Sequence, residues 1–207
     1  MKKANQEFAR NATKKLIQNN MPHINLIDRY KTEISKELEK ELGIKNKMAI
    51  PKVEKVVVNM GIGDLVKNKE QSKAIMADLA MIIGQKPSAR PAKISVAGFN
   101  VREGMPVGLS ATLRGQKMYD FLEKLFTIVL PRLRDFRGLS LKSFDKNGNY
   151  TIGIVEHTVF PEVDINKSAA ARGLEVTIVT NVNNVEESKK LLTLMGMPLE
   201  KEEESEK

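Results

Sequence analysis

Apolar residues recur every three or four positions in four parts of the chain, which predicts four amphipathic helices. The clearest stretch is 26–42, where an apolar residue returns at every fourth position between lysines and glutamates. Asn25 is placed to cap the start of this helix, and Gly43 is placed to end it. The same period predicts further helices over 68–83, 116–130 and 184–195.

Other segments alternate apolar and polar residues, or are rich in β-branched residues, and these predict strands. Over 107–114, apolar residues alternate with glycine, serine, threonine and arginine, which is typical of an antiparallel strand with one buried face. The small residues of its other face leave room for a partner to lie against it. The remaining predicted strands are 53–60, 93–97, 150–156 and 174–180.

These elements predict a single α+β domain, because neither an internal repeat nor a long glycine- and serine-rich linker divides the chain. We expect this domain to span residues 22–199. Residues 1–21 form a polar, basic N-terminal extension, and residues 200–207 form an acidic tail that is expected to be disordered. The ordinary role of such a tail is to add solubility.

The composition of the chain removes several kinds of chemical site. It contains no Cys, which excludes disulfides, iron–sulfur clusters, thiolate zinc sites and thiol nucleophiles. With two His residues, a metal site would have to be built almost wholly from carboxylates. No run approaches the length of apolar sequence that a spanning helix needs, so we expect no membrane partner.

Charge is distributed unevenly along the chain. The formal net charge is +8, and it divides into +5 over residues 1–50, +8 over 51–144 and −5 over 145–207. An excess of positive charge indicates a polyanionic partner, and nucleic acid is the commonest one. We therefore expect a nucleic-acid side on the first two-thirds of the chain.

Two features would suit an enzyme instead. A glycine-rich turn at 61–63 lies between a predicted strand and a predicted helix, as in dinucleotide-binding folds. Val66 occupies the position of the third glycine of that fingerprint, so a flexible turn is the simpler interpretation. His157 beside Glu156 is a pair suited to acid–base work, although an isolated pair is more often structural. A basic interaction module that binds no RNA is a third hypothesis.

The residue types present favour structured RNA over single strands. Proteins that bind single strands stack bases on aromatic side chains, and this chain has no Trp and only three Tyr. Its Lys, Arg, Ser, Thr, Asn and Gln residues suit contacts with phosphates and 2′-hydroxyls. Arg132, Arg134 and Arg137 can each hold a phosphate by two hydrogen bonds; the alternative is an ordinary surface with salt bridges to Asp135.

Seven collinear motifs resemble the family of the universal large-subunit ribosomal protein five. The resemblance extends over roughly residues 22–199, and its motifs are long and occur in the family's order. The first 20 residues and the acidic tail lie outside it. The motifs are PKVEKVVVNMGIG at 51–63, GQKP at 84–87, SVAGFNVREGMPVG at 95–108, ATLRG at 111–115, PRLRDFRGLSLKSFDKNGNY at 131–150, FPEVD at 160–164 and RGLEVTIVT at 172–180.

This resemblance implies a non-catalytic, cofactor-free constituent of the large ribosomal subunit, located in the cytoplasm on the ribosome. Its fold would be an antiparallel sheet with helices packed on one face, and with the open face and loops toward RNA. The implied partners are 5S rRNA in the central protuberance, 23S-type rRNA and other central-protuberance proteins. The implied rRNA-binding residues are Asn59, Gln85, Lys86, Thr112, Arg114, Arg132, Arg134 and Arg137.

Two further contacts follow from the same resemblance. The loop after GQKP would approach the peptidyl-site tRNA, and the turn before Tyr150 would face the small-subunit head protein thirteen in an intersubunit bridge. Gly98 and Gly104 would give the tRNA loop its conformational freedom. The residues implied for tRNA contact are Lys93, Ser95, Phe99, Asn100 and Arg102, and those implied for the bridge are Asn147, Asn149 and Tyr150.

Overall fold

The computed structural model describes residues 25–63, 69–134, 136–164 and 171–200. The predicted N-terminal extension lies outside these ranges, as do Val66, the predicted helix start at Asn68, Asp135 and all of the acidic tail after Glu200.

One antiparallel sheet forms the centre of the molecule, with its strands in the order β2-β3-β1-β5-β4. The prediction of an α+β fold is therefore confirmed. The strands are β1 (Val53–Gly61), β2 (Ser88–Pro91), β3 (Pro106–Leu113), β4 (Tyr150–Ile154) and β5 (Leu174–Thr180).

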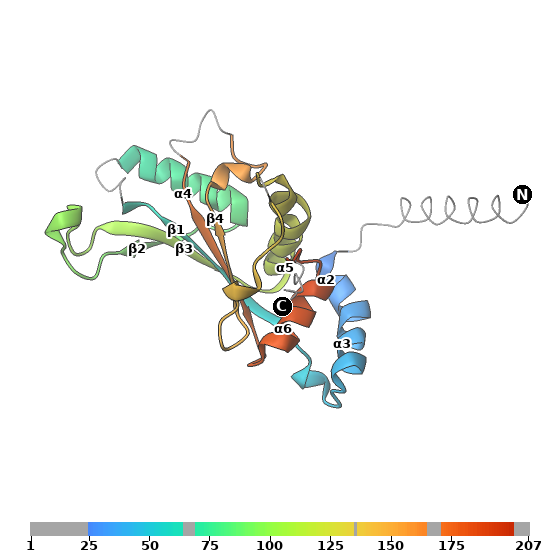
Figure 1. Ribbon diagram of the computed structural model, residues 1–207. Coiled ribbons are helices and arrows are strands. Elements are labelled where there is room, and N and C mark those ends of the chain that lie inside the picture. The colour runs from blue at the N-terminus through green and yellow to red at the C-terminus, as the bar shows by residue number, and fades with distance from the viewer. Residues whose placement is uncertain (1–24, 64–68, 135, 165–170, 201–207) are drawn as a thin grey trace, which may run out of the picture.

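The prediction of a strand at 93–97 is wrong. The chain pairs with β3 earlier, at Ser88–Pro91, and 93–97 belongs to a loop with a single bridge between Val96 and Val101. The alternation in this segment is real, but nothing covers its apolar residues: Ile94 is 73% exposed. The β2–β3 hairpin extends away from the helices (Figure 1), so the pattern there does not mark a buried strand.

The helices lie where the apolar period predicted them. Residues 26–42 form one continuous helical segment in which a π-helical turn at Tyr30–Ile34 separates α2 from α3, and Gly43 ends it with φ of +63°. The side chain of Asn25 makes no capping hydrogen bond, contrary to prediction, although Asn184 does cap α6 by accepting from the Glu186 amide. The helices are α2 (Leu26–Arg29), α3 (Ser35–Leu42), α4 (Lys69–Ile83), α5 (Gly115–Lys124) and α6 (Val185–Leu194).

Shorter helical turns complete the chain. After α5, the chain continues through a π-helical turn at Leu125–Val129 and a 3₁₀ turn at Leu130–Arg132. Further 3₁₀ turns are Lys47–Ala49, Ala97–Phe99, Leu141–Ser143 and His157–Val159. In the part of the chain that the structure describes, no helix is long and apolar enough to cross a membrane.

The helices cover one face of the sheet and leave the other open. α4 and α5 lie along the same face (Figure 1), and the side chains that point toward them are buried, such as Val56 and Val58 on β1 and Leu113 on β3. Alternate residues point to the opposite face because side chains in a strand alternate between its two sides. This second face holds the candidate interface.

Candidate nucleic-acid interface

Small and polar side chains are aligned across the open face by the register of the sheet. Asn59 on β1 lies opposite Ser110 on β3 and opposite Glu175 on β5, and Gly153 on β4 lies opposite Glu175. These four positions form a row across four strands. Asn59 and Glu175 in this row are at least partly exposed and offer a folded RNA hydrogen-bond donors and acceptors, whereas Ser110 is buried.

A second row crosses the same face two residues away. It contains Thr112, Val57, Thr177 and Thr151 on β3, β1, β5 and β4 in turn. The hydroxyl oxygens of Thr151 and Thr177 are 3.3 Å apart, so one donates to the other. The predicted open face of β3 is therefore part of a larger surface, which continues over three neighbouring strands.

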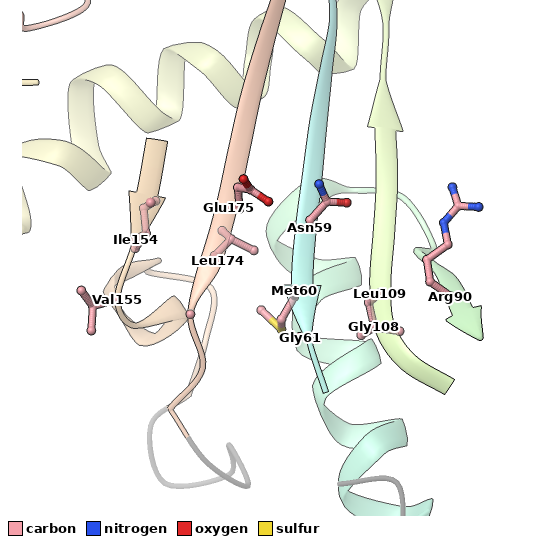
Figure 2. Close-up of a pocket in the computed structure, with 12 residues that line it drawn as sticks. Asn59, Met60, Gly61, Arg90, Gly108, Leu109, Ile154, Val155, Leu174 and Glu175 are labelled. Carbon is pink, nitrogen blue, oxygen red and sulfur yellow. The ribbon is translucent and has the colours of Figure 1, made fainter. Parts of the chain in front are cut away.

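Glycines hollow out the face on the side of Asn59 away from Thr112. Gly61 pairs with Gly108, and with Gly153 they line a hollow of about 620 Å³. Figure 2 shows Asn59 and Glu175 on neighbouring strands of this hollow and Arg90 at its edge on β2. A Cβ added at Gly61 or Gly153 would meet nothing within 4 Å, so a ligand can approach the backbone closely at these two positions.

Gln85 and Thr112, two of the predicted rRNA-binding residues, are brought into contact. Gly84 ends α4 with φ of +64°, and the next side chain reaches the sheet: Nε2 of Gln85 donates to the Thr112 carbonyl at 3.4 Å. This bond lies just beyond Ser88, where β2 begins to pair with β3. The amide of Gln85 thus continues the hydrogen bonding along β3, and the Thr112 hydroxyl stays on the exposed face.

Lys86 and Arg114 lie beside these two residues. Lys86 is exposed directly after Gln85. Nη1 of Arg114 donates to the Glu54 carbonyl at 3.4 Å, which holds the exposed guanidinium at the edge of the open face. Gln85, Lys86, Thr112 and Arg114 therefore lie toward one end of this surface, and Asn59 lies further along β1, opposite Ser110.

Arg132, Arg134 and Arg137 form a separate group after α5. All three are exposed, whereas Leu133 and Phe136 between them are partly buried against the core. The apolar residues hold this segment on the body and turn the guanidiniums outward. No described carboxylate forms an ion pair with any of the three.

The predicted tRNA-contact residues lie together at the end of the β2–β3 hairpin. Lys93, Ser95, Phe99, Asn100 and Arg102 are all exposed, and Phe99 is 80% exposed. The loop holds its own shape, because the Ser95 hydroxyl oxygen accepts from the amide of Glu103 at 2.9 Å. Asn100 adopts a left-handed conformation with φ of +52°, which asparagine tolerates better than most residues.

The predicted bridge residues do not all face outward. Asn147 is exposed, but the Asn149 amide is engaged: Nδ2 donates to Oδ2 of Asp145 at 2.8 Å, and Oδ1 accepts from the Thr180 amide at 3.2 Å. The hydrogen bond from the Asn149 side chain is the main cause that lowers the pKa of Asp145. The side chain of Asn149 therefore stabilises this turn, and Asn147 is the residue of the pair that is exposed.

Tyr150 is a core residue, which corrects the expectation that its side chain contacts a partner. It is 1% exposed, its hydroxyl donates to the Ser140 carbonyl at 2.7 Å, and its ring meets that of Phe144 edge-on at 4.6 Å. Burial raises the pKa of Tyr150, a hydrogen bond with Ser143 lowers it, and the nearby Glu200 carboxylate raises it.

The features that suited an enzyme are structural. His157 is fully buried; its Nδ1 accepts from the Arg172 amide at 3.0 Å, and its Nε2 lies 3.8 Å from Oδ2 of Asp78. The 61–63 turn begins within the sheet, since the Ile62 amide donates to the Val107 carbonyl. Among the described residues, no three His, Asp or Glu side chains gather as a metal site.

Two residues of the open face escaped prediction. Glu175 belongs to a predicted strand whose alternation places it outward, but only the register shows that it lies opposite Asn59. Arg90 belongs to β2, whose position was predicted wrongly. A carboxylate among these polar groups can accept hydrogen bonds from amino groups, whereas Arg90 can bind phosphate.

Comparison with known proteins gives matches over most of the chain. The family model described as ribosomal protein L5 matches residues 46–102, and the model of the C-terminus of the same ribosomal family matches residues 106–199. The large ribosomal subunit protein uL5 of Dehalococcoides mccartyi is 53% identical over 175 residues, which are 84% of this chain and 97% of that protein. The protein of the same name from Carboxydothermus hydrogenoformans is 50% identical over 173 residues, again 84% of this chain and 97% of that protein.

Proposed function

This chain belongs to the ribosomal protein L5 family, and from that premise we propose that it binds 5S rRNA in the central protuberance through the open face of its sheet. As a member of the family it is a non-enzymatic structural constituent of the large ribosomal subunit, and it sits on the ribosome in the cytoplasm.

The observation that carries the proposal is the alignment of Asn59 and Thr112 on one uncovered face, with Gln85 hydrogen-bonded at its edge. The Asn59 amide and the Thr112 hydroxyl both donate and accept hydrogen bonds, and their strands are held by the packed helices behind them. A rigid arrangement of this kind suits the 2′-hydroxyls and base edges of folded RNA. Lys86 and Arg114 at the border supply phosphate contacts.

The other exposed groups suggest the remaining partners. Arg132, Arg134 and Arg137 would hold phosphates of 5S or 23S-type rRNA, and the hairpin loop with Phe99 would reach the peptidyl-site tRNA. Asn147 at its turn would face the small-subunit head protein thirteen. Other central-protuberance proteins would complete the surroundings. These assignments are supported by the exposure of the residues and by the family to which the chain belongs.

Binding of 5S rRNA to the purified protein tests the proposal. Asn59→Ala and Thr112→Val should each weaken binding by about 5- to 150-fold, which corresponds to about 1–3 kcal/mol for removing one partner of a buried hydrogen bond. Thr127→Val is the matched control, because Thr127 is exposed on a helix and lies outside the open face. Equal affinity of the protein for 5S rRNA and for an unrelated structured RNA would overturn the proposal.

Salt dependence separates the arginine group from the open face. Replacing Arg132, Arg134 and Arg137 together by Gln should reduce the slope of log affinity against log salt by about 2–3. It should weaken binding of 5S rRNA and of unrelated RNA by similar factors, since phosphate contacts carry no sequence information. An unchanged slope would remove these three residues from the interface.

A further inference from the structure

The end of the described chain is fastened beside the arginine group. Leu199 forms a parallel bridge with Leu139. The Leu139 amide donates to the Pro198 carbonyl at 2.9 Å, and the Glu200 amide donates to the Leu139 carbonyl at 3.0 Å. Two backbone hydrogen bonds thus hold the last described residues in place, and residue 201 must continue from that point.

Gly138 allows this close approach. It has φ of +116°, and a Cβ placed there would lie 2.8 Å from both Cα and N of Glu200. Any other residue at this position would collide with the backbone of the C-terminal segment. The contact between the two segments is therefore a specific feature of the fold and defines where the following residues emerge.

The surface at this point is basic. We call residues 132–142 the basic segment; its cationic side chains are all exposed. Arg137 lies two residues before the bridge at Leu139, and Lys142 lies three residues after it. The bridge is parallel, so the two segments run in the same direction at Leu139 and Leu199. The four cations are Arg132, Arg134, Arg137 and Lys142.

The residues that follow are acidic. Residues 201–207 have the sequence KEEESEK, with four glutamates and two lysines. Seven residues span at most about 25 Å when extended, which brings both Arg137 and Lys142 within reach. Opposite charges on one chain, joined by a short and anchored connection, meet at a high effective concentration.

We propose that residues 201–207 lie against the basic segment in the free protein and that bound RNA displaces them. The consequence for RNA rests on the proposed function. Non-specific RNA binding is supplied by phosphate contacts, so it must compete with the glutamates for the same guanidiniums. Displacing them costs specific and unrelated RNA the same free energy, because both use these guanidiniums for phosphate contacts. The acidic residues would therefore weaken the binding of specific and of unrelated RNA by similar factors.

A spin label tests the contact without RNA. The chain has no Cys, so Ser205→Cys provides a single attachment point. In the full chain at low salt, the label should broaden the NMR signals of the Arg137 and Lys142 side chains and leave that of Arg102 on the hairpin sharp. The broadening should disappear in 1 M salt, where charges are screened beyond about 3 Å.

A charge-neutral variant is the matched control. Replacing Glu202, Glu203, Glu204 and Glu206 by Gln in the labelled chain keeps its length and should abolish the broadening. Absence of broadening at 132–142 in the Ser205→Cys chain with its glutamates intact would overturn the proposal. The proposal would also be overturned if the signals broadened only by transfer between molecules. That result is seen when a spin-labelled chain without isotope is mixed with an isotope-labelled chain without spin label, and it would mean that the occupant is a second copy of the chain.

RNA binding tests the consequence. Deleting residues 201–207 should strengthen binding of an unrelated structured RNA by about five- to tenfold, the effect expected of several exposed charge pairs. It should strengthen 5S rRNA binding by a similar factor, and both gains should vanish when Arg132, Arg134 and Arg137 are replaced by Gln. Unchanged affinity for unrelated RNA would overturn the masking effect.

The two proposals fail in different ways. If the protein does not prefer 5S rRNA, the proposed function fails, while the spin label still decides whether residues 201–207 occupy the basic segment. If 5S rRNA binds selectively and the label broadens no signal of the basic segment, the proposed function stands and the contact is refuted.

Discussion

The body of the molecule and its hairpin arm differ in how far their side chains are buried. The body comprises the helices with β1, β3, β4 and β5, and the arm comprises residues 88–105. In the body even polar groups are enclosed: the hydroxyl oxygens of the buried Thr180 and Ser188 lie 3.0 Å apart, and the former group also donates to the Gly148 carbonyl. In the arm, all four residues of β2 are exposed.

This difference indicates where the molecule depends on a partner. The arm keeps its shape with backbone hydrogen bonds, such as those between Ala92 and Met105 and between Val96 and Val101, and buries little apolar surface. Ile94 and Phe99 are 73% and 80% exposed. An exposed apolar side chain contributes to stability or binding only when another surface covers it and removes it from water. The body is therefore expected to determine stability, and the arm to determine contacts.

The largest expected contrast comes from removing one phenyl ring in each region. Phe160 is 1% exposed and stacks with Phe121 at 6.2 Å between ring centroids, so Phe160→Ala should lower the free energy of unfolding by about 3–5 kcal/mol. Phe99→Ala should change it by no more than about 0.5 kcal/mol. Urea unfolding followed by circular dichroism measures both. Comparable losses would show that the arm contributes to stability.

Glycine substitutions give the next largest effect. Gly148→Ala should cost about 2–3 kcal/mol, because φ is +75° and the new Cβ would lie 2.5 Å from Oγ of Ser188. Gly104→Ala should cost about 1 kcal/mol for its φ of +84°, since its Cβ meets nothing within 4 Å. Gly98→Ala has neither problem and should be nearly neutral.

Thermal or urea unfolding of these three variants separates steric overlap from backbone strain. Equal costs for Gly148→Ala and Gly104→Ala would mean that the Ser188 side chain moves away without loss. A large cost for Gly98→Ala would contradict the description of the arm as an open structure.

The smallest expected effect concerns pH, and it arises in the body alone because all three Tyr residues lie there. Burial, and secondly Tyr119, raise the pKa of Tyr30 to about 12. The unfolded chain, with an ordinary tyrosine pKa near 10, therefore loses its proton first. The resulting stabilisation is complete below about pH 10 and is lost as the pH rises toward about 12.

Tyr30→Phe should flatten this alkaline loss, measured as the urea midpoint between about pH 9 and 12. It should also cost about 1 kcal/mol at neutral pH, because the Tyr30 hydroxyl donates to the Pro51 carbonyl at 2.8 Å. A steep decline that persists unchanged in the variant would assign the effect to Tyr119 or Tyr150, whose pKa values burial also raises.

Periodicity predicted the body better than the arm for a physical reason. The predicted strand at 174–180 matches β5, and helix 26–42 ends at Gly43 as expected, because those apolar residues are covered. The alternation at 93–97 had the same appearance, but its residues project from the sheet. A pattern of apolar residues reports the capacity to be buried, and only the surroundings determine whether burial occurs.

The candidate site was predicted in a similar, partial way. Thr112 was correctly placed on an open strand face, because alternation determines which side of a strand a residue occupies. Its contact with Gln85 and the opposition of Asn59 and Glu175 depend on register and on the path of the chain after α4. Tyr150 illustrates the converse, since a polar aromatic residue beside a turn proved to be a core residue.

The sequence by itself determined the α+β class, the helix faces, the polar side of β3, the absence of thiol chemistry and the division of charge along the chain, because each of these depends on residue identity and local spacing. Only the tertiary structure decided which strands adjoin, which side chains face outward at the 145–149 turn, and that Leu199 is fastened to Leu139 beside the basic segment. Those features are pairings between distant parts of the chain, and their geometry arises when the helices and the sheet enclose a common core.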